Sequence, residues 1–427
     1  MNNKTTITLF VAMACIVSGP TLAAYKYKNK RVKDAAIYSR VNKAQAIIDQ
    51  NSAQNTVPKC NWMNRITIGG LANFDASWGS RTPIGTFGLF SNKDSSDINI
   101  NNANLLIDAK VNYWVKGHIN LAYLGDQDKG FQIPLDKVGV RLGDSRLSVD
   151  EAYVDINNFA RTSFYGRIGK QYVGFGDYKR YPIIKPITQL LTQTRATAVT
   201  LGAVTNMGIY ANVSGFNGAT DKIGKMDRRL NNVTAKIGYS RSIHNVGCSD
   251  TIFNIDASWI ANMYDINSLS PIYNYGRITP TSVQPGYSNP VGGLALHGDL
   301  ELGAFCLWAN YVHSLKKMEL INTLTTPDIT LLSSKIWAAD INAGYRFQTL
   351  GRESKINASY QFTGSADKYP IIIPNKQLPQ DRFQLGYDVD AWRYTNLGIA
   401  WAHDINYSGT GLNKHSDQIV GRLSVQF

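Results

Sequence analysis

The residue types that most often perform catalysis are present in this chain, but not in a catalytic spacing. His118 and Asn120 form the nearest local pair for a barrel hydrolase, yet no serine signature accompanies them. The chain also has no Walker A motif and no GxSxG elbow. The six histidines show no HxH or HExxH pattern; they are His118, His244, His297, His313, His403 and His415. The sequence therefore predicts no catalytic residues and no enzyme activity.

Metal and cofactor chemistry has equally little support. The stretch Asp126–Gly130 resembles the start of a calcium loop, but it lacks the third acidic ligand and the distal Glu. No CxxC pair is present, and beyond Cys15 the chain contains Cys60, Cys248 and Cys306. Cys248 and Cys306 fall at predicted short turns on one side of the membrane, where an oxidising compartment permits a disulfide. We expect no metal and no cofactor, and the Cys248–Cys306 disulfide is an open prediction.

The dominant signal from Trp62 onward is a strict alternation of apolar and polar residues. One such run reaches from Leu105 to Val115, and others surround Ile68, Ile255 and Ile341. Alternation with period two places one set of side chains on each face of a β-strand. Charged residues make up only 18% of the 427 residues, against about 25% in ordinary soluble domains. These features favour a membrane β-barrel over a soluble domain.

The connections between these runs support a barrel of about sixteen strands. The runs centre near positions 71, 109, 120, 151, 168, 199, 211, 236, 257, 297, 309, 342, 359, 386, 399 and 421. Long polar links alternate with short ones, as expected for external loops and tight periplasmic turns. The chain ends in Phe427 after alternating apolar residues, which resembles the last strand of bacterial outer-membrane proteins. We therefore predict an all-β, transmembrane, antiparallel up-and-down barrel over residues 61–427.

Aromatic residues near the ends of the predicted strands fit the girdles that flank the apolar belt of such barrels. We expect seven residues in the girdles: Trp62, Trp78, Trp114, Tyr172, Tyr264, Trp392 and Tyr394.

The residues that alternate with the apolar ones along each strand would face a lumen. They include both acidic and basic residues, which a water-filled pore tolerates and a packed core does not. The pore-lining candidates are Lys110, Arg167, Lys236, Arg346, Arg422, Asp75, Asp108 and Asp256. One long link, 176–195, is basic and apolar with two prolines. Large barrels often fold one loop into the pore, and its candidate constriction residues are Lys179, Arg180, Lys185 and Arg195. An external loop packed on a neighbour fits this link equally well.

The amino terminus predicts export. Residues 1–24 have a basic start, an apolar stretch and small residues before position 25, which is the pattern of a secretory signal peptide. Residues 25–60 form a basic periplasmic segment. Ile37, Val41, Ala44 and Ile48 recur at helical spacing within it. The segment is either partly helical or a solvated linker.

Several stretches resemble the LbtU-type siderophore porins, which are outer-membrane barrels of Gram-negative bacteria. The similar stretches are Leu105–His118, Val149–Val154, Gly166–Gly176, Thr194–Val199 and Ser214–Gly218. The resemblance is clearest over residues 60–220, and the basic segment after the signal departs from it. It implies a barrel of roughly sixteen strands that takes up ferric siderophore without an energy-coupled plug. It transfers no ligand-binding residues.

The leading hypothesis is thus a porin-like channel for ferric siderophore or other small anionic solutes, steered by Lys and Arg. The expected partners are the lipid bilayer, lipopolysaccharide and that solute, with a homo-oligomer left open and no nucleic acid. An energy-coupled receptor would need 22 strands, which is more than this length supplies. A closed-lumen structural or adhesion barrel is the alternative, and a barrel hydrolase is a third class.

Overall fold

The computed structural model describes residues 65–80, 95–124, 146–177, 183–220, 222, 229–243, 251–267, 269, 287–322, 329–365, 378–407 and 414–427. The predicted signal peptide, the basic segment 25–60 and the acidic stretch Asp126–Gly130 lie outside the described residues. Among the described residues, no helix is long and apolar enough to cross a bilayer.

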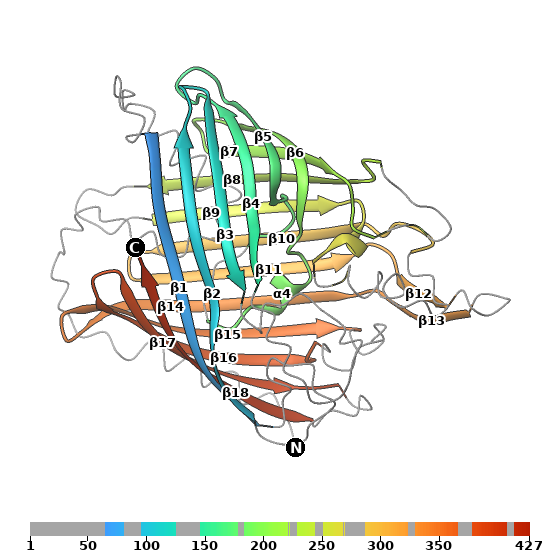
Figure 1. Cartoon of the computed structure of the whole chain (residues 1–427). Helices are drawn as coiled ribbons and strands as arrows, with labels where there is room; N and C mark the ends of the chain where they lie inside the picture. The colour runs from blue at the N-terminus through green and yellow to red at the C-terminus, as the bar shows by residue number, and fades with distance from the viewer. Residues whose placement is uncertain are drawn as a thin grey trace.

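Sixteen antiparallel strands close into one barrel, which confirms the predicted fold class (Figure 1). In chain order, the wall comprises β1 (Ile66–Ser80), β2 (Ser95–Lys110), β3 (Val115–Leu124), β4 (Arg146–Asn157), β5 (Phe164–Tyr172), β6 (Arg195–Val204), β7 (Ile209–Phe216), β8 (Asn232–Ile243), β9 (Thr251–Ile260), β10 (Gly293–Leu302), β11 (Phe305–Ser314), β14 (Trp337–Thr349), β15 (Arg352–Gly364), β16 (Asp381–Trp392), β17 (Thr395–Ile405) and β18 (His415–Gln426).

Short elements lie in the described parts of the connections. The helix α4 (Ile187–Leu190) lies between β5 and β6, and the 3-10 helix η2 (Met263–Asp265) lies between β9 and β10. The strands β12 (Met318–Asn322) and β13 (Ile329–Ser334) form a separate two-stranded sheet between β11 and β14. Figure 1 shows this hairpin projecting beyond the barrel wall, whereas α4 lies between the walls.

The predicted alternation sorts side chains between lipid and lumen. Outward residues such as Ile68, Leu147 and Leu201 are 65%, 71% and 66% exposed. Inward residues such as Asn102 and Thr234 are fully buried. A polar interior behind an apolar outer surface is the reverse of a soluble core, and it is the pattern of a barrel whose outer wall faces lipid.

Strand β2 ends earlier than the sequence indicated. The apolar alternation continues to Val115, but the strand stops at Lys110. The side-chain oxygen of Asn112 accepts hydrogen bonds from the backbone N–H groups of Trp114 and Val115, at 2.8 and 2.9 Å. Asn side chains commonly stabilise turns in this way, so the alternating residues beyond Lys110 form the tight turn to β3.

Part of the aromatic expectation is wrong. Trp78, Trp114, Trp392 and Tyr394 are 39–61% exposed at strand ends, as girdle residues should be. Tyr172 and Tyr264 are instead buried, at 9% and 1% exposure. The Tyr172 hydroxyl donates to Asp150, and the Tyr264 ring stacks on Tyr287. Trp62 lies outside the described residues.

The barrel closes where β18 pairs with β1. The terminal Phe427 N–H donates to the Gly70 carbonyl, and the Gly70 N–H donates to the Phe427 carbonyl, at 3.1 and 2.8 Å. A Cβ on residue 70 would lie 2.2 Å from the Phe427 ring, so any larger residue here would have to displace that ring. The terminal aromatic residue therefore completes the seam of the wall.

Candidate functional site

The most distinctive part of the lumen is the β5–β6 connection, residues 173–194, which we call the inward loop. Residues 178–182 of it lie outside the described part of the chain. Its first limb contacts the wall at β8 and β9. The Gly176 N–H donates to the Ser258 hydroxyl at 2.9 Å, and the Lys236 ammonium donates to the Gly176 carbonyl at 3.1 Å. The first limb therefore lies inside the barrel.

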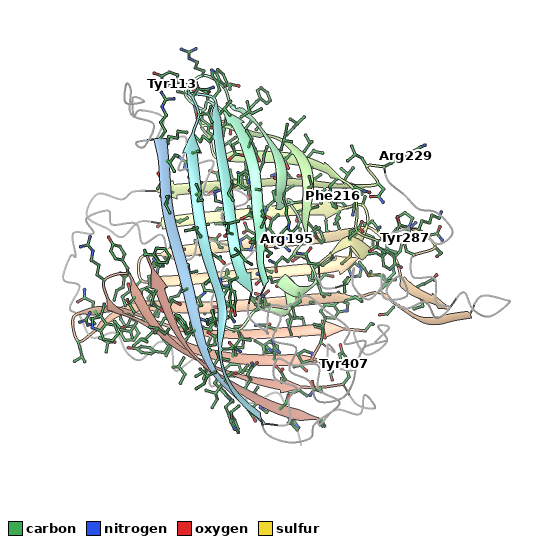
Figure 2. The ribbon with its side chains drawn as sticks, in the orientation of Figure 1. Tyr113, Arg195, Phe216, Arg229, Tyr287 and Tyr407 are labelled. Atoms are coloured by element: carbon green, nitrogen blue, oxygen red, sulfur yellow. The ribbon has the colours of Figure 1, made fainter. Side chains whose placement is uncertain are left out.

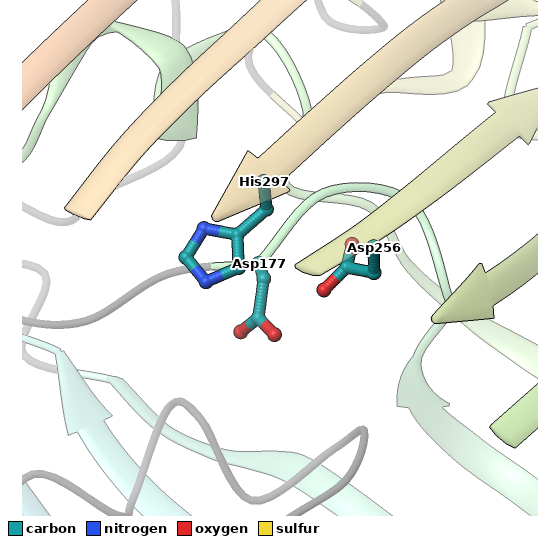
Figure 3. Close-up of side chains that lie close together, drawn as sticks. All are labelled: Asp177, Asp256 and His297. Carbon is teal, nitrogen blue, oxygen red and sulfur yellow. The ribbon is translucent and has the colours of Figure 1, made fainter. Parts of the chain in front are cut away.

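Lys236 holds this limb through a buried charge cluster. Its side chain is fully buried, and its Nζ lies 3.4 Å from Asp177 of the loop and 3.2 Å from Asp256 of β9. Figure 3 shows Asp177, Asp256 and His297 converging, and one ligand atom from each lies within 4.8 Å of the others. That donor set could hold a metal, but the lysine ammonium already supplies positive charge to both carboxylates. The geometry fits an internal ion pair.

The second limb is anchored by α4 farther around the wall, at β14 and β15. The Ile187 N–H donates to the Gln361 side chain of β15 at 2.9 Å, and the Thr188 hydroxyl donates to Asp340 of β14. Asn310 of β11 donates to both oxygens of Asp340, at 3.1 and 3.2 Å. The inward loop is therefore tied to β8, β9, β14 and β15.

The part of the inward loop at Ile183, which we call the loop tip, packs against small residues on the inner face of β17 and β18. Ile183 packs with Ala400 of β17 and Val420 of β18 in a small buried cluster. At Gly398, an added Cβ would lie 2.6 Å from Ile183 Cδ1 and 2.4 Å from Asp388 Oδ1. Small side chains at these inward positions leave room for the loop.

We expect Gly398→Val to displace the loop tip, because the new side chain overlaps Ile183 and Asp388. Overpacking of this kind costs about 1–3 kcal/mol. The measurement is the temperature at which the purified barrel loses its compact, heat-modifiable migration in SDS gels. Gly215→Val is the matched control, since a Cβ there meets nothing within 4 Å. Equal unfolding temperatures for the two variants would contradict the packing assigned to Ile183.

Apolar side chains from two connections pack into one buried cluster with residues of β6–β14. The inward loop contributes Val173, Phe175, Ile187 and Leu191 to one buried hydrophobic cluster. The β9–β10 connection contributes a second group: Met263, Tyr264, Ile266, Leu269, Tyr287 and Val291. The two connections are also joined by hydrogen bonds from Asn267 N to the Gln193 carbonyl and from Arg195 N to the Asn267 side chain, both 3.0 Å. The inward loop therefore packs against the β9–β10 connection in one buried hydrophobic cluster.

Asp265 of η2 lies in this connection, outside the spanning strands. It accepts hydrogen bonds from the Thr220 N–H at 2.8 Å and the Asn232 amide at 2.7 Å. Burial raises the pKa of its carboxyl from 3.8 to about 6, and these hydrogen bonds only partly offset the burial. The folded state therefore binds the proton more tightly than the unfolded state does.

A pH dependence follows with a defined sign. The contribution of the Asp265 proton is fully present below pH 3.8 and is lost as pH rises through about 6. Two pKa units correspond to on the order of 2–3 kcal/mol. We expect Asp265→Asn to flatten the decline in unfolding temperature between pH 4 and pH 6.5, measured by circular dichroism. Asp390→Asn, at the other end of the barrel, serves as the control. An unchanged pH profile in Asp265→Asn would refute this assignment.

The predicted pore-lining charges mostly lie in the lumen, and several of them lie beside an opposite charge. Arg167 binds Asp155 at 2.6 Å, Arg346 binds Glu301 at 2.8 Å, and Arg422 binds Asp75 at 2.6 Å. Asp108 lies 2.6 Å from His118, and Asp256 binds Lys236. Lys110 is exposed at the end of β2, away from the inward loop. The partners could not be named from sequence, because they depend on strand register.

The predicted constriction residues are only partly described. Lys179 and Arg180 lie outside the described residues, and Lys185 is half-buried in the loop. Arg195 forms an ion pair with Asp150 of β4 and lies between the walls near α4 (Figure 2). Their roles in restricting passage stay predictions.

The disulfide also stays a prediction. Cys306 is buried on β11, and Cys248 lies outside the described residues.

Sequence reasoning missed the residues that hold the loop in place. Asp177, Thr188, Gln361 and Gly398 carry no motif, and their roles appear only when distant strands are brought together. The alternation of apolar and polar residues predicts that Gln361 and Gly398 face inward. That is the one signal in the sequence that could have marked them as lumen residues.

Comparison with known proteins gives distant relatives. No family model matches the chain. A UPF0422 protein of Coxiella burnetii is 26% identical over 368 residues, covering 84% of this chain and 70% of that protein. A UPF0422 protein of Legionella pneumophila is 22% identical over 373 residues, covering 82% of this chain and 66% of that protein.

Solved structures give the same fold. The outer membrane channel DcaP of Acinetobacter baumannii superposes with a TM-score of 0.54 at 12% identity, covering 85% of this chain and 97% of that one. OmpF of Salmonella typhi has a TM-score of 0.52 at 13% identity, with coverage of 85% and 97%. OprB of Pseudomonas putida has a TM-score of 0.52 at 8% identity, with coverage of 85% and 94%. With its closed wall and apolar outer surface, this chain is a sixteen-stranded outer-membrane β-barrel of the porin fold.

Proposed function

We propose that this protein is a passive, porin-like channel without an energy-coupled plug. The observation that carries the proposal is the inward loop, which is tied to both sides of a lumen lined by polar and charged side chains. Such a loop narrows a water-filled barrel and sets which solutes pass. The fold shared with outer-membrane porins points to a channel rather than an enzyme.

For the solute, we propose a ferric siderophore. The resemblance of stretches such as Leu105–His118 and Gly166–Gly176 to LbtU-type siderophore porins supports this choice. An anionic chelate was expected from the inward Lys and Arg residues. Because Arg167, Arg346 and Arg422 each lie within 3 Å of a carboxylate, their charge does not by itself select an anion.

Two measurements test the channel and its solute separately. The purified protein in a planar bilayer should give discrete conductance steps, and a folded protein that gives none would refute the channel. A deletion strain under iron limitation should grow poorly on a defined ferric siderophore and recover with the intact gene. Normal growth of the deletion strain would remove the siderophore and leave the channel standing.

A closed-lumen structural or adhesion barrel is the second candidate. The inward loop favours it, because its first limb is bonded to inward residues of β8 and β9 and takes space that an open pore would leave to water. Liposome swelling distinguishes the two functions. Influx of small sugars supports the channel, whereas no influx together with surface binding to host or envelope partners supports the closed barrel.

We also propose contacts with lipopolysaccharide and assembly as a homo-oligomer. The apolar outer wall is suited to lipid and to a second copy alike. Chemical cross-linking in intact outer membranes tests the assembly, and a band at the monomer mass alone would contradict it.

A further inference from the structure

His297 of β10 lies between the two anchors of the inward loop. In the strand register it stands opposite Asp256 of β9 and Asn310 of β11, and its side chain is only 2% exposed. Asp256 binds Lys236, which holds the first limb of the loop. Asn310 binds Asp340, which holds the second limb through α4. A change at His297 can therefore act on both anchors.

Both ring nitrogens of His297 face oxygen atoms. Nδ1 lies 2.6 Å from Asn310 Oδ1, and Nε2 lies 3.3 Å from Asp299 Oδ2. The orientation of the Asn310 amide is set from its other side, because its Nδ2 donates to both oxygens of Asp340 at 3.1 and 3.2 Å. Amide oxygens and carboxylates only accept hydrogen bonds. Each ring nitrogen must therefore carry a hydrogen, which is the imidazolium form.

The charges around the ring favour the same form. One ligand atom from each of His297, Asp177 and Asp256 lies within 4.8 Å of the others (Figure 3), and a third carboxylate, Asp299, binds Nε2. Lys236 supplies one positive charge to this group. Buried charges are tolerated when they are paired, so three carboxylates and one ammonium favour a second cation. An imidazolium also has no lone pair to offer a metal ion.

The other members of this network titrate in different pH ranges. Asn254 donates to Asp299 at 3.0 Å, and Tyr210 of β7 donates to Asp256 at 3.0 Å. The titratable groups around His297 are Asp177 of the inward loop, Tyr210 of β7, Lys236 of β8, Asp256 of β9, Asp299 of β10 and Asp340 of β14. Ordinary pKa values are about 3.9 for aspartate and about 10 for tyrosine and lysine, whereas histidine titrates near neutrality.

Loss of one proton from His297 would disrupt the contact with Asn310. Asp299 keeps the remaining hydrogen on Nε2, because a hydrogen bond to a charged acceptor is the stronger one. Nδ1 then presents a lone pair to the Asn310 oxygen, and the amide has to turn over to donate to it. Its oxygen would then face Asp340, acceptor against acceptor, beside the carboxylate oxygen that binds Thr188 of α4.

We propose that protonated His297 holds the second limb of the inward loop in place and that its deprotonation releases this limb. The barrel is then narrower at acidic and neutral pH and wider in alkali. The inference rests on the proposed channel function and adds its regulation. The sign follows from the hydrogen bonds, which are complete in the imidazolium and lose one member as pH rises through its titration. Asp177, whose side chain is 13% exposed, gives the network a contact with solvent.

Nitrogen-15 NMR of the histidine-labelled protein in detergent tests the protonation directly. At pH 7 both ring nitrogens of His297 should resonate as protonated nitrogens, and the signals are identified by their loss in His297→Gln. At pH 9 one of the two should have moved to the unprotonated range. A ring that already has one unprotonated nitrogen at pH 7 would overturn the proposal.

Single-channel conductance at pH 6 and pH 9 tests the consequence. The wild-type protein should conduct more at pH 9 by roughly twofold, because a released loop leaves a wider constriction. His297→Gln cannot become a cation, and Thr188→Val lacks the hydroxyl that binds Asp340, so both should conduct at the higher level at either pH. His415→Gln, an exposed histidine at the start of β18, should behave as the wild type does.

The outcomes for the loop and for the channel are distinguishable. A conducting protein with equal wild-type conductance at both pH values refutes the role of His297 and leaves the channel standing, as does a pH dependence that survives in His297→Gln. A protein that never conducts refutes the channel. Hydrogen–deuterium exchange of inward-loop peptides, corrected for the intrinsic effect of pH, then decides the role of His297. Exchange should be faster at pH 9 in the wild type, and exchange that is equal at both pH values would refute the release.

Discussion

Lys236→Met is expected to destabilise the barrel by about 3–5 kcal/mol, because breaking a buried ion pair from one side leaves uncompensated charge. The Lys236 side chain is fully buried and lies 3.2 and 3.4 Å from Asp256 and Asp177. Without the ammonium, two carboxylates face each other and the Gly176 carbonyl loses its donor. The first limb of the inward loop should detach, so single-channel conductance should rise while the unfolding temperature falls.

Two controls separate charge from packing. Lys316 is exposed, so Lys316→Met makes the same change without stranding a buried charge. It should leave the unfolding temperature and the conductance unchanged. Adding Asp256→Asn to Lys236→Met removes one of the stranded charges and should recover part of the lost stability. If Lys236→Met unfolds at the wild-type temperature with wild-type conductance, Lys236 does not hold the loop.

Arg422→Leu is expected to weaken the closure of the barrel to a similar extent. The guanidinium binds Asp75 through two hydrogen bonds of 2.6 Å across the β18–β1 seam, and Asp75 is 1% exposed. A bidentate pair of this kind is strong and geometrically specific. Its loss leaves a buried carboxylate in the seam and should cost about 3–5 kcal/mol.

Urea unfolding of the refolded barrel, followed by tryptophan fluorescence, measures this loss. Arg352→Leu, an exposed arginine at the start of β15, is the matched control. In a double-mutant cycle with Asp75→Asn, the coupling energy between the two positions should account for most of the loss. Additive effects of the two substitutions would show that the pair does not stabilise the seam.

The strands and connection lengths were predictable because period-two alternation and turn residues are local signals. Every predicted strand centre lies within a strand of the wall, although the run centred near 109 includes the turn at Asn112. The two misplaced girdle residues have the expected residue type, and Tyr172 ends β5 whereas Tyr264 lies beyond the end of β9. Side-chain direction at a strand end depends on loop packing, which alternation does not encode.

The candidate site was less predictable because it is made by register and by loop contacts. The alternation placed Arg167 and Arg422 on the inner face, but only the pairing of strands identifies Asp155 and Asp75 as their partners. The basic 176–195 link was recognisable as unusual from its composition. Its anchors, from Ser258 to Gln361, come from strands far along the chain, so no local pattern could reveal them.

The seam between β1 and β18 also constrains how this protein is made. Asp75 and Arg422 are separated by 347 residues, so the contacts that close the wall form only when the last strand is available. Until then both edge strands present unpaired backbone groups, which are templates for aggregation. Contacts of such long sequence separation are also slow to form. A chain truncated by even its final strand should therefore accumulate as an open, aggregation-prone sheet and not as a smaller barrel.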